Sequence, residues 1–329
     1  MSRTVTLKDI AVKAGVSTAA ISQALNDRGN LRPETRDRIK AVAAELGYVP
    51  NKYAAALRSG RTMSVGFVMA EDADDDSAKR WALHRTRQLN ALVRASAEHG
   101  FTVTVLPESR PDLLAGAHID VLYFPDAHGT HAVLREAVSR GIPVVANDLL
   151  IDTDRGLSIR TGYDAAVRAG LDLLAASGAH RIAFLVDEGG HPRDEIGETA
   201  YRAWMTVRGL DVQIARVDAG RRSLGRRLRE VVDAGADAVF AFCEEGPEIY
   251  LQLEATALVI PRDIQLIALC TTECALNDRL GVTHVCVHPE RAAEEVFATL
   301  GRIGGLVGTT VVDLPWELVR GSTTRAAVR

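Results

Sequence analysis

The sequence predicts a small all-α head followed by a much larger α/β body with parallel sheets. In residues 1–61, apolar positions recur at the three- and four-residue spacing of helices. From residue 62 onwards, short β-rich runs alternate with helical stretches, a pattern typical of parallel sheets covered by helices. Charge divides at the same place, because residues 1–61 hold 11 Lys and Arg against 5 Asp and Glu (+6), whereas the other 268 residues hold 28 against 38 (−10).

The head begins with a pattern typical of a helix-turn-helix motif. The apolar residues of its first helix fall on one helical face: Leu7, Ile10, Ala11 and Ala14. Thr6 suits the N-cap of this helix, with Asp9 three residues later in the position of a capping box. Gly15 then ends the helix. Ser17 can cap a second helix over residues 18–26.

A third helix completes the core of the head. It begins at Pro33, a residue suited to a first helical turn, and ends at Gly47, a residue suited to the position after a helix. The apolar side chains that the second and third helices are expected to bury are Ile21, Leu25, Ile39, Val42 and Leu46. Three short helices with one shared core follow from these positions.

The second helix keeps a face of short polar side chains. This face consists of Ser17, Thr18, Ala19, Ser22, Gln23 and Asn26. Such a face suits the major groove of DNA, and the basic balance of the head would attract the phosphate backbone. The alternative is a three-helix protein-interaction module with a solvated face. The charge division between head and body favours DNA.

Two segments of the head, VTLKDIAVKAGVSTAAISQALN and RPETRDRIKAVAAELGYVPNKYAAALRSG, resemble the DNA-binding head of the lactose-repressor (LacI) family without a gap over roughly 55 residues. The resemblance implies that Thr18, Ala19 and Gln23 face base edges. It implies phosphate contacts by Ser17, Ser22, Asn26 and Thr35, with Asn30 approaching the DNA from the following loop. The implied interface also includes Thr6, Leu7, Tyr48, Asn51, Ala54 and Leu57.

Gln23 departs from the family pattern, because many members carry arginine there. Arginine pairs best with guanine and glutamine with adenine, so the base preference at this position is open.

Residues 50–61 resemble the hinge helix of the same family. Asn51 can cap it and its alanines favour a helix, yet about seven residues are too few for a stable isolated helix. The resemblance implies that a dimer partner and the DNA minor groove support it, with Leu57 wedged between central base pairs. The alternative is a flexible linker whose Leu57 packs against its own domain. We interpret the segment as the wedge.

The body shows β-rich runs at residues 64–69, 101–106, 121–124, 143–147, 181–186, 238–242 and 265–269, with helices expected at 78–98 and 131–140. The segments GIPVVAND, LLAASGAHRIAFLVD, VIPRDIQLIAL and LPWELVRGST resemble landmarks of the LacI-family effector domain. This resemblance implies two α/β lobes of the periplasmic-binding-protein type, with a ligand cleft beyond the carboxyl ends of the strands. The expected divisions are therefore a head over 1–49, a hinge and linker over 50–61, and an effector-binding and dimerisation domain over 62–329.

The cleft loops depart from the pattern of sugar-binding relatives. Candidate effector contacts are Met69, Asp126, Asp148, Gly197, Cys243, Glu244 and Cys270. Gly197, Cys243 and Cys270 stand where those relatives carry arginine, asparagine or aspartate, so a simple sugar is not expected. Acids near the cleft (Asp126, Asp148, Asp187, Glu188 and Glu244) suit a cationic or aromatic effector. A solvated acidic rim, or no effector at all, is the alternative.

The four cysteines are Cys243, Cys270, Cys274 and Cys286, and they form no CxxC pair. With His284 and His288 they could collect around a soft metal, because His284, Cys286 and His288 would alternate onto one strand face. We interpret them as small buried core residues, so no metal and no cofactor is expected. No catalytic triad, phosphate-binding glycine loop or HExxH run points to an enzyme.

The function expected is that of a dimeric transcription repressor in the cytoplasm, bound to a near-palindromic DNA operator and controlled by a small-molecule effector. No apolar run approaches the length of a membrane span. A metal- or redox-responsive, or effector-independent, regulator on the same scaffold is the first alternative. An α/β binding protein or enzyme with an incidental helical head is the second.

Overall fold

A computed structural model describes residues 5–25, 29–48, 62–69, 76–125, 132–149, 155–188, 192–218, 221–243, 246–271, 274–288, 291–300 and 308–326. It divides into two compact units, Met1–Thr62 and Met63–Arg329. These units are the head and the body.

The head consists of three helices, α1 (Leu7–Ala14), α2 (Thr18–Leu25) and α3 (Pro33–Glu45). Each helix contributes one fully buried isoleucine to a single core: Ile10, Ile21 and Ile39. Ala24 and Ala43 are also buried. Leu25, Val42 and Leu46, which the sequence predicted to be buried, are only half-buried around them. Helices this short pack closely where an alanine faces the neighbouring helix, which moves the larger side chains to the margin of the core.

Local signals in the sequence produce the helix-turn-helix. Asp9 accepts hydrogen bonds from the Thr6 amide at 2.8 Å and the Thr6 hydroxyl at 2.6 Å, as the capping pattern predicted. Gly15 ends α1 with a φ of 67°, a conformation that favours glycine. Ser17 Oγ accepts from the Ala20 amide at 3.2 Å and so caps α2.

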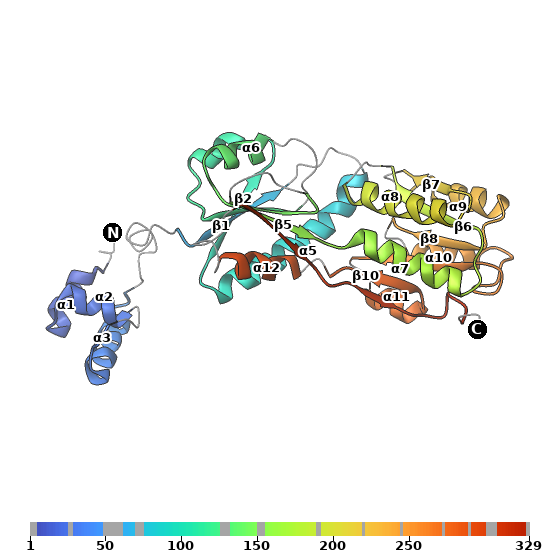
Figure 1. The fold of residues 1–329 in the computed structure, drawn as a ribbon. Coiled ribbons are helices and arrows are strands. Elements are labelled where there is room, and N and C mark those ends of the chain that lie inside the picture. Colours follow the sequence, from blue (N-terminus) through green and yellow to red (C-terminus); the bar gives the residue numbers. More distant parts are fainter. Residues whose placement is uncertain are drawn as a thin grey trace. The chain divides into compact units, whose positions relative to one another are not determined.

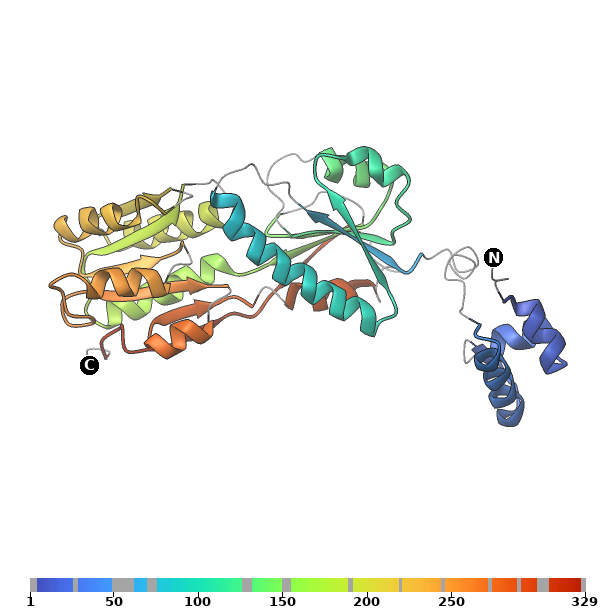
Figure 2. The same ribbon diagram turned by 180° about the vertical axis from the view of Figure 1, so that it is seen from behind.

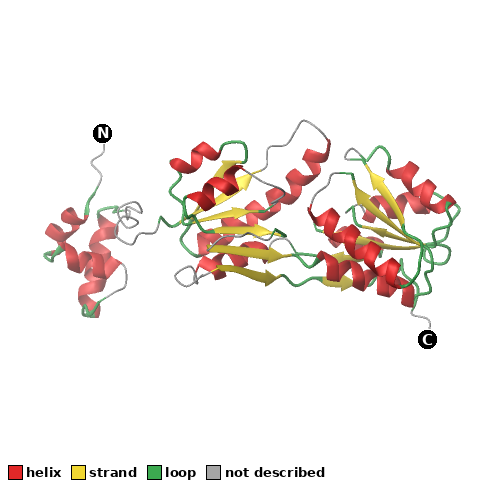
Figure 3. Cartoon of the chain, turned by 45° about the horizontal axis from the view of Figure 1, so that its top comes forward, coloured by secondary structure: helices red, strands yellow, loops and turns green. Residues whose placement is uncertain are grey.

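The body contains two six-stranded sheets, one in each lobe (Figures 1 and 3). The first has the order β11-β5-β4-β3-β1-β2. Its strands are β1 (Ser64–Met69), β2 (Thr102–Pro107), β3 (Val121–Phe124), β4 (Val144–Asn147), β5 (Arg155–Arg160) and β11 (Gly308–Asp313). The second has the order β12-β10-β9-β8-β6-β7. Its strands are β6 (Ile182–Asp187), β7 (Gln213–Val217), β8 (Ala238–Ala241), β9 (Gln265–Cys270), β10 (Thr283–Cys286) and β12 (Glu317–Val319).

Helices cover these sheets and bury their apolar side chains (Figure 2). The first lobe carries α5 (Asp76–Glu98), the short 3-10 helix η1 (Pro111–Ala115), α6 (Ala132–Ser139) and α12 (Arg291–Leu300). The second carries α7 (Tyr163–Ala176), α8 (Pro192–Val207), α9 (Leu224–Asp233), α10 (Gly246–Glu254) and α11 (Cys274–Leu280). None of the helices within the described residues is both long and apolar enough to cross a membrane.

Three connections join the lobes: from β5 to α7, from β10 to α12, and from β11 to β12. Gly162 lies in the first connection with a φ of 79°, and a Cβ there would approach Trp316 Cδ1 of the third connection to 2.9 Å. The first two connections leave from the carboxyl ends of parallel strands. The carboxyl ends of both sheets therefore lie on the side of the connections, where ligands of such folds bind.

The predicted α/β class is confirmed, and each strand predicted from the sequence is present with ends that move by one residue at most. The predicted runs did not include β5, β7, β10, β11 or β12. It was also wrong to expect only parallel pairing, because β12 runs antiparallel to β10. β10 ends at Cys286, and His288 has a φ of 35°, so the alternation of His284, Cys286 and His288 along one strand does not hold.

Candidate DNA-binding face and effector site

The exposed face of α2 is the candidate DNA-reading surface. Its core face carries Ile21 and Ala24, both fully buried. On the other side, Ser17, Thr18, Ala19 and Gln23 are exposed and Ser22 is half-buried. No long apolar side chain interrupts this face among the residues that the structure describes. Short polar groups of this kind can approach base edges and phosphates.

A glycine in the loop after α2 lies directly against Gln23. Gly29 has a φ of 76°, and a Cβ at this position would lie 2.7 Å from both Cδ and Oε1 of Gln23. Arg36 of α3 donates a hydrogen bond to the Gly29 carbonyl at 3.1 Å. This hydrogen bond holds the loop against α3. Because Gly29 has no side chain, it leaves room for Gln23, at the position where many relatives carry arginine. Sequence reasoning did not identify Arg36 as a positioning residue, because its contact depends on the fold of the loop.

The other residues of the expected interface divide into four groups. Asn30 is exposed, and Thr35 in the first turn of α3 is half-buried. Leu7 and Tyr48 pack partly against the head core, so they also have a structural role. Thr6 is exposed and engaged in the cap of α1. Asn26, Asn51, Ala54 and Leu57 lie outside the described residues, so their expected DNA contacts stay predictions.

In the body, a cluster of four buried charges lies at the carboxyl end of β6. Asp187 pairs with Arg193 Nη2 at 3.0 Å and with Arg221 Nη1 at 2.9 Å, and Arg193 Nε lies 3.2 Å from Asp194 Oδ1. Each of these side chains is 10% exposed or less. The two guanidinium groups balance the two carboxylates, which is what buried charges require. We call these four residues the charge cluster.

Two of the acids expected near the cleft already have partners in the structure. Asp187 is already neutralised within the charge cluster. Asp148, at the end of the first lobe's sheet, has a φ of 52° and accepts hydrogen bonds from the Thr161 amide at 2.8 Å and the Thr161 hydroxyl at 2.6 Å. Asp126 and Glu244 lie outside the described residues. A carboxylate that already has partners has less to offer a cationic ligand, which applies to Asp187 and Asp148, whereas Glu188 is exposed.

Gly197 occupies the helix position where sugar-binding relatives carry arginine, and an aromatic ring fills the adjacent space. A Cβ on Gly197 would lie 2.5 Å from Cε1 of Phe242, whose side chain is fully buried. Cys243 is also fully buried and packs in the core of the second lobe, while its carbonyl accepts a hydrogen bond from Arg221. An arginine cannot be accommodated at position 197 unless Phe242 moves.

Two further residues lie at the carboxyl end of the first lobe's sheet. Met69, a predicted effector contact, is half-buried at the end of β1. Asn147 ends β4 and is buried, with its amide donating to the Tyr123 hydroxyl at 3.0 Å. Sequence reasoning noted Asn147 only as a strand end, although a buried amide at a strand end in this fold is suitably placed for ligand recognition.

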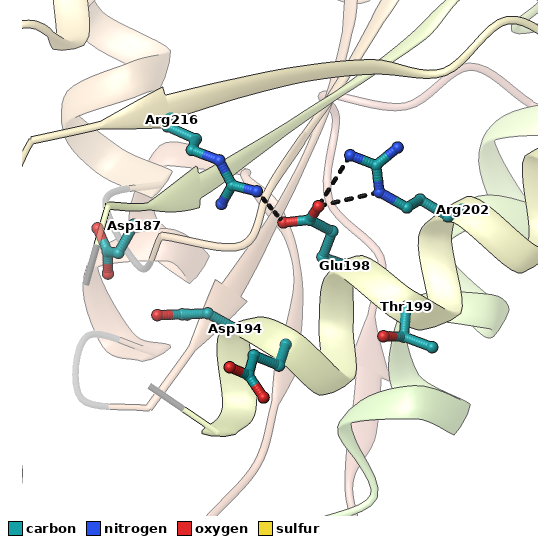
Figure 4. Close-up of a pocket in the computed structure, with 7 residues that line it drawn as sticks. Asp187, Asp194, Glu198, Thr199, Arg202 and Arg216 are labelled. Atoms are coloured by element: carbon teal, nitrogen blue, oxygen red, sulfur yellow. Dashed lines mark hydrogen bonds and ion pairs between the residues drawn. The ribbon is translucent and has the colours of Figure 1, made fainter. Parts of the chain in front are cut away.

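A groove of about 490 Å³ runs along α8 and β7 from the charge cluster (Figure 4). The residues that line it are all polar or charged: Asp187, Asp194, Glu195, Glu198, Thr199, Arg202 and Arg216. Glu198 lies between the two arginines, 2.9 Å from Arg202 and 2.7 Å from Arg216. The groove was not expected from the sequence, because α8 and β7 are brought together only by the fold.

Cys270, the last of the predicted effector contacts, lies against another cysteine. Its Sγ lies 2.9 Å from that of Cys274. Cys243 and Cys270 are therefore buried in different surroundings, and their expected contacts with an effector stay predictions.

Known protein families match both the head and the body. Residues 6–51 match the profile of bacterial regulatory proteins of the lacI family, and residues 171–324 match that of the periplasmic binding protein-like domain. The HTH-type transcriptional regulator PtxS of Pseudomonas plecoglossicida is 27% identical, over 97% of this chain and 96% of its own length.

Two solved structures of regulators align with nearly the full length of this chain. The lac repressor dimer bound to operator and the anti-inducer ONPF aligns with a TM-score of 0.74 and 18% identity, covering 98% of this chain and all of that one. The CelR–cellobiose complex aligns with a TM-score of 0.65 and 22% identity, covering 97% and 99%.

A helix-turn-helix head joined to a two-lobed α/β body of the periplasmic binding type defines a class of DNA-binding transcription regulators, not enzymes. The chain belongs to the lacI family of bacterial regulatory proteins. Both the family and the fold class expected from the sequence are confirmed. The interpretation as an enzyme with an incidental head is excluded, because relatives align across both units.

Proposed function

We propose that this regulator is a dimeric repressor that binds a near-palindromic operator and responds to a small-molecule effector other than a neutral sugar. The exposed polar face of α2, carried by a head with a balance of +6, is the observation that supports it most strongly. A dimer bound to operator is the state of the lac repressor, whose fold this chain shares. Two heads related by twofold symmetry would read two half-sites. The cytoplasm is the compartment that this role requires.

Base reading by Gln23 gives the sharpest test of the proposal. Glutamine forms a bidentate pair with adenine and arginine with guanine, and a good pair discriminates by roughly 1–3 kcal/mol. Gln23→Arg should therefore shift the preferred half-site from adenine toward guanine at one position. Selection of binding sites from random DNA by the two proteins measures this change.

Two outcomes of the selection would oppose the proposal. Identical half-sites for both proteins would remove Gln23 from the base-reading set. Recovery of single half-sites, without a symmetric partner, would exclude the dimer. Ser139→Ala in the body is a suitable control, because its hydroxyl bonds only within its own helix and should leave the selected sequence unchanged.

Leu57 provides a second test, which concerns the hinge. Leu57→Ala removes the expected apolar wedge while keeping helix propensity, so specific affinity and DNA bending should both fall while general DNA binding persists. Fluorescence anisotropy measures affinity, and the migration of circularly permuted DNA fragments measures bending. If neither changes, residues 50–61 act only as a linker.

The proposal on the effector depends on which side chains at the strand ends can contact a ligand. Phe242 fills the space beside Gly197, and the Arg193 guanidinium is already paired with two aspartates. A buried sugar needs partners for its hydroxyls, and each unpaired group costs roughly 1–3 kcal/mol. The ring of Phe242 and the paired guanidinium of Arg193 therefore leave little at these strand ends to hold a neutral hexose. A cation alone is less favoured than the sequence indicated, because Asp187 and Asp148 already have partners.

Isothermal calorimetry of the full-length chain should therefore detect no binding of neutral hexoses or pentoses at micromolar concentration. The panel also includes amino acids, small carboxylates, polyamines and nucleosides. Bound ligands are then tested for an effect on operator affinity, which separates effectors from incidental binders. Micromolar binding of a neutral sugar would show that other residues replace the missing arginine and would overturn the proposal on effector class, leaving the DNA-binding proposal intact.

A further inference from the structure

Three of the four cysteines come together at the end of the second lobe's sheet. Cys270 ends β9, Cys274 begins α11, and Cys286 ends β10. The Sγ atoms of Cys270 and Cys274 are 2.9 Å apart, those of Cys274 and Cys286 are 2.8 Å apart, and all three lie within 4.8 Å of one another. We call these residues the thiol triad. The pairing of β9 with β10 places Cys270 directly opposite Cys286.

Apolar packing does not account for this arrangement. A buried cysteine that acts as a small hydrophobic residue contacts carbon atoms, at the 3.5–4.0 Å separation typical of dispersion contacts. Cys243 is such a residue, fully buried among the apolar side chains of the second lobe. The thiol triad instead directs three sulfur atoms at one point. The sequence interpretation as small buried residues holds for Cys243, Cys270 and Cys286, whereas Cys274 is half-buried; packing alone does not explain why three thiols converge.

The thiol triad is accessible from one side. Thiolate is the form of cysteine that binds metals. Cys274 is half-buried while Cys270 and Cys286 are buried, so an ion could enter from the side of Cys274.

A histidine stands beside Cys286 and is the candidate for a fourth ligand. His288 Nδ1 lies 3.7 Å from Cys286 Sγ. Two ligand atoms of one tetrahedral zinc ion, a nitrogen at about 2.0 Å and a sulfur at about 2.3 Å, are about 3.5 Å apart. The other ring nitrogen of His288, Nε2, lies 3.8 Å from Glu317 Oε1 on β12. A carboxylate behind a ligating histidine is the usual way in which the ring is oriented.

We propose that Cys270, Cys274, Cys286 and His288 form a binding site for a thiophilic metal ion of the Zn²⁺ class, with Glu317 orienting the histidine. Three thiolates and one imidazole constitute a known type of closed tetrahedral zinc site, and soft sulfur ligands disfavour Mg²⁺ and Ca²⁺. Sulfur ligands of one tetrahedral zinc ion are about 3.7 Å apart, so binding requires the thiol triad to spread by less than 1 Å at its two short separations.

Such a site would link separate segments of the body. Cys286 and His288 belong to the start of the connection from β10 to α12, and Glu317 follows the connection from β11 to β12. A bound ion would thus fasten two of the three connections to the end of β9. Metal occupancy would stabilise the second lobe by mass action, which makes thermal stability a direct readout.

Zn²⁺ is added to the full-length, metal-stripped protein under a reducing agent that does not bind metals, and bound metal is measured by mass spectrometry and by competition with a chromogenic chelator. The wild-type chain should bind a single ion and melt at a higher temperature with Zn²⁺. Co²⁺ should give the intense absorption of tetrahedral thiolate coordination. Cys274→Ala, at the least buried cysteine of the thiol triad, should lower affinity by roughly 100-fold or more, because even outer-shell partners contribute 10–100-fold.

Cys243→Ala is the matched control, because it removes one buried thiol outside the triad and should keep full metal binding. Glu317→Gln should weaken binding by roughly tenfold while leaving stability without metal unchanged. The proposal is overturned if wild type binds no Zn²⁺ at micromolar concentration, if Cys274→Ala binds as tightly as wild type, or if two cysteines of the thiol triad stay joined in a disulfide under the reducing agent. The DNA-binding proposal is untouched by each of these results, because no measurement involves DNA.

Discussion

Operator affinity should fall by roughly 10³- to 10⁵-fold as monovalent salt rises from about 50 to about 200 mM. Two heads that together contact about six to ten phosphates release a corresponding number of counterions on binding, and salt opposes that release. The head supports this expectation with its balance of +6. Fluorescence anisotropy of a labelled operator at several salt concentrations gives the slope of log affinity against log salt.

The salt response has a matched control in the body. Arg262→Gln removes an exposed charge that pairs with its neighbour Asp263, far from the head in the sequence, and should leave the slope unchanged. Native mass spectrometry on the same complex should show two chains for each operator. A flat salt response would contradict the phosphate contacts, and one chain for each operator would contradict the dimer.

Asp187→Ala should reduce the free energy of unfolding of the body by about 3–5 kcal/mol, because it leaves Arg193 and Arg221 buried without their shared carboxylate. Asp164→Ala removes an exposed i,i+4 partner of Arg168 and should cost no more than about 1 kcal/mol. Urea unfolding followed by circular dichroism compares the two variants. Equal losses would show that the charge cluster is no more important for stability than a surface ion pair.

The same substitution has a functional consequence. The charge cluster joins the end of β6 to the start of α8 and to Arg221, which lies between β7 and α9. These are the strand-end segments at which a ligand of this fold binds. A variant that still folds should therefore lose effector response even where its head binds DNA normally.

The sequence by itself determined the head and the class of the body. The cap between Thr6 and Asp9, the turn at Gly15 and the start of α3 at Pro33 all depend on residues within four positions of one another. Short-range signals of this kind can be read directly from spacing. The alternation of strands and helices likewise predicted parallel sheets. It did not predict the antiparallel β12, because a strand of three residues carries little pattern.

The tertiary structure alone decided the chemistry of the strand ends. Asp187 and Arg221 are 34 positions apart, Gly197 meets Phe242 across the second lobe, and Cys270 faces Cys286 only through the register of β9 and β10. From the sequence, the acids suggested a free cationic site and the cysteines suggested core. Burial requires charges to be paired, and sheet register decides which side chains converge, so neither property can be read from composition or local spacing.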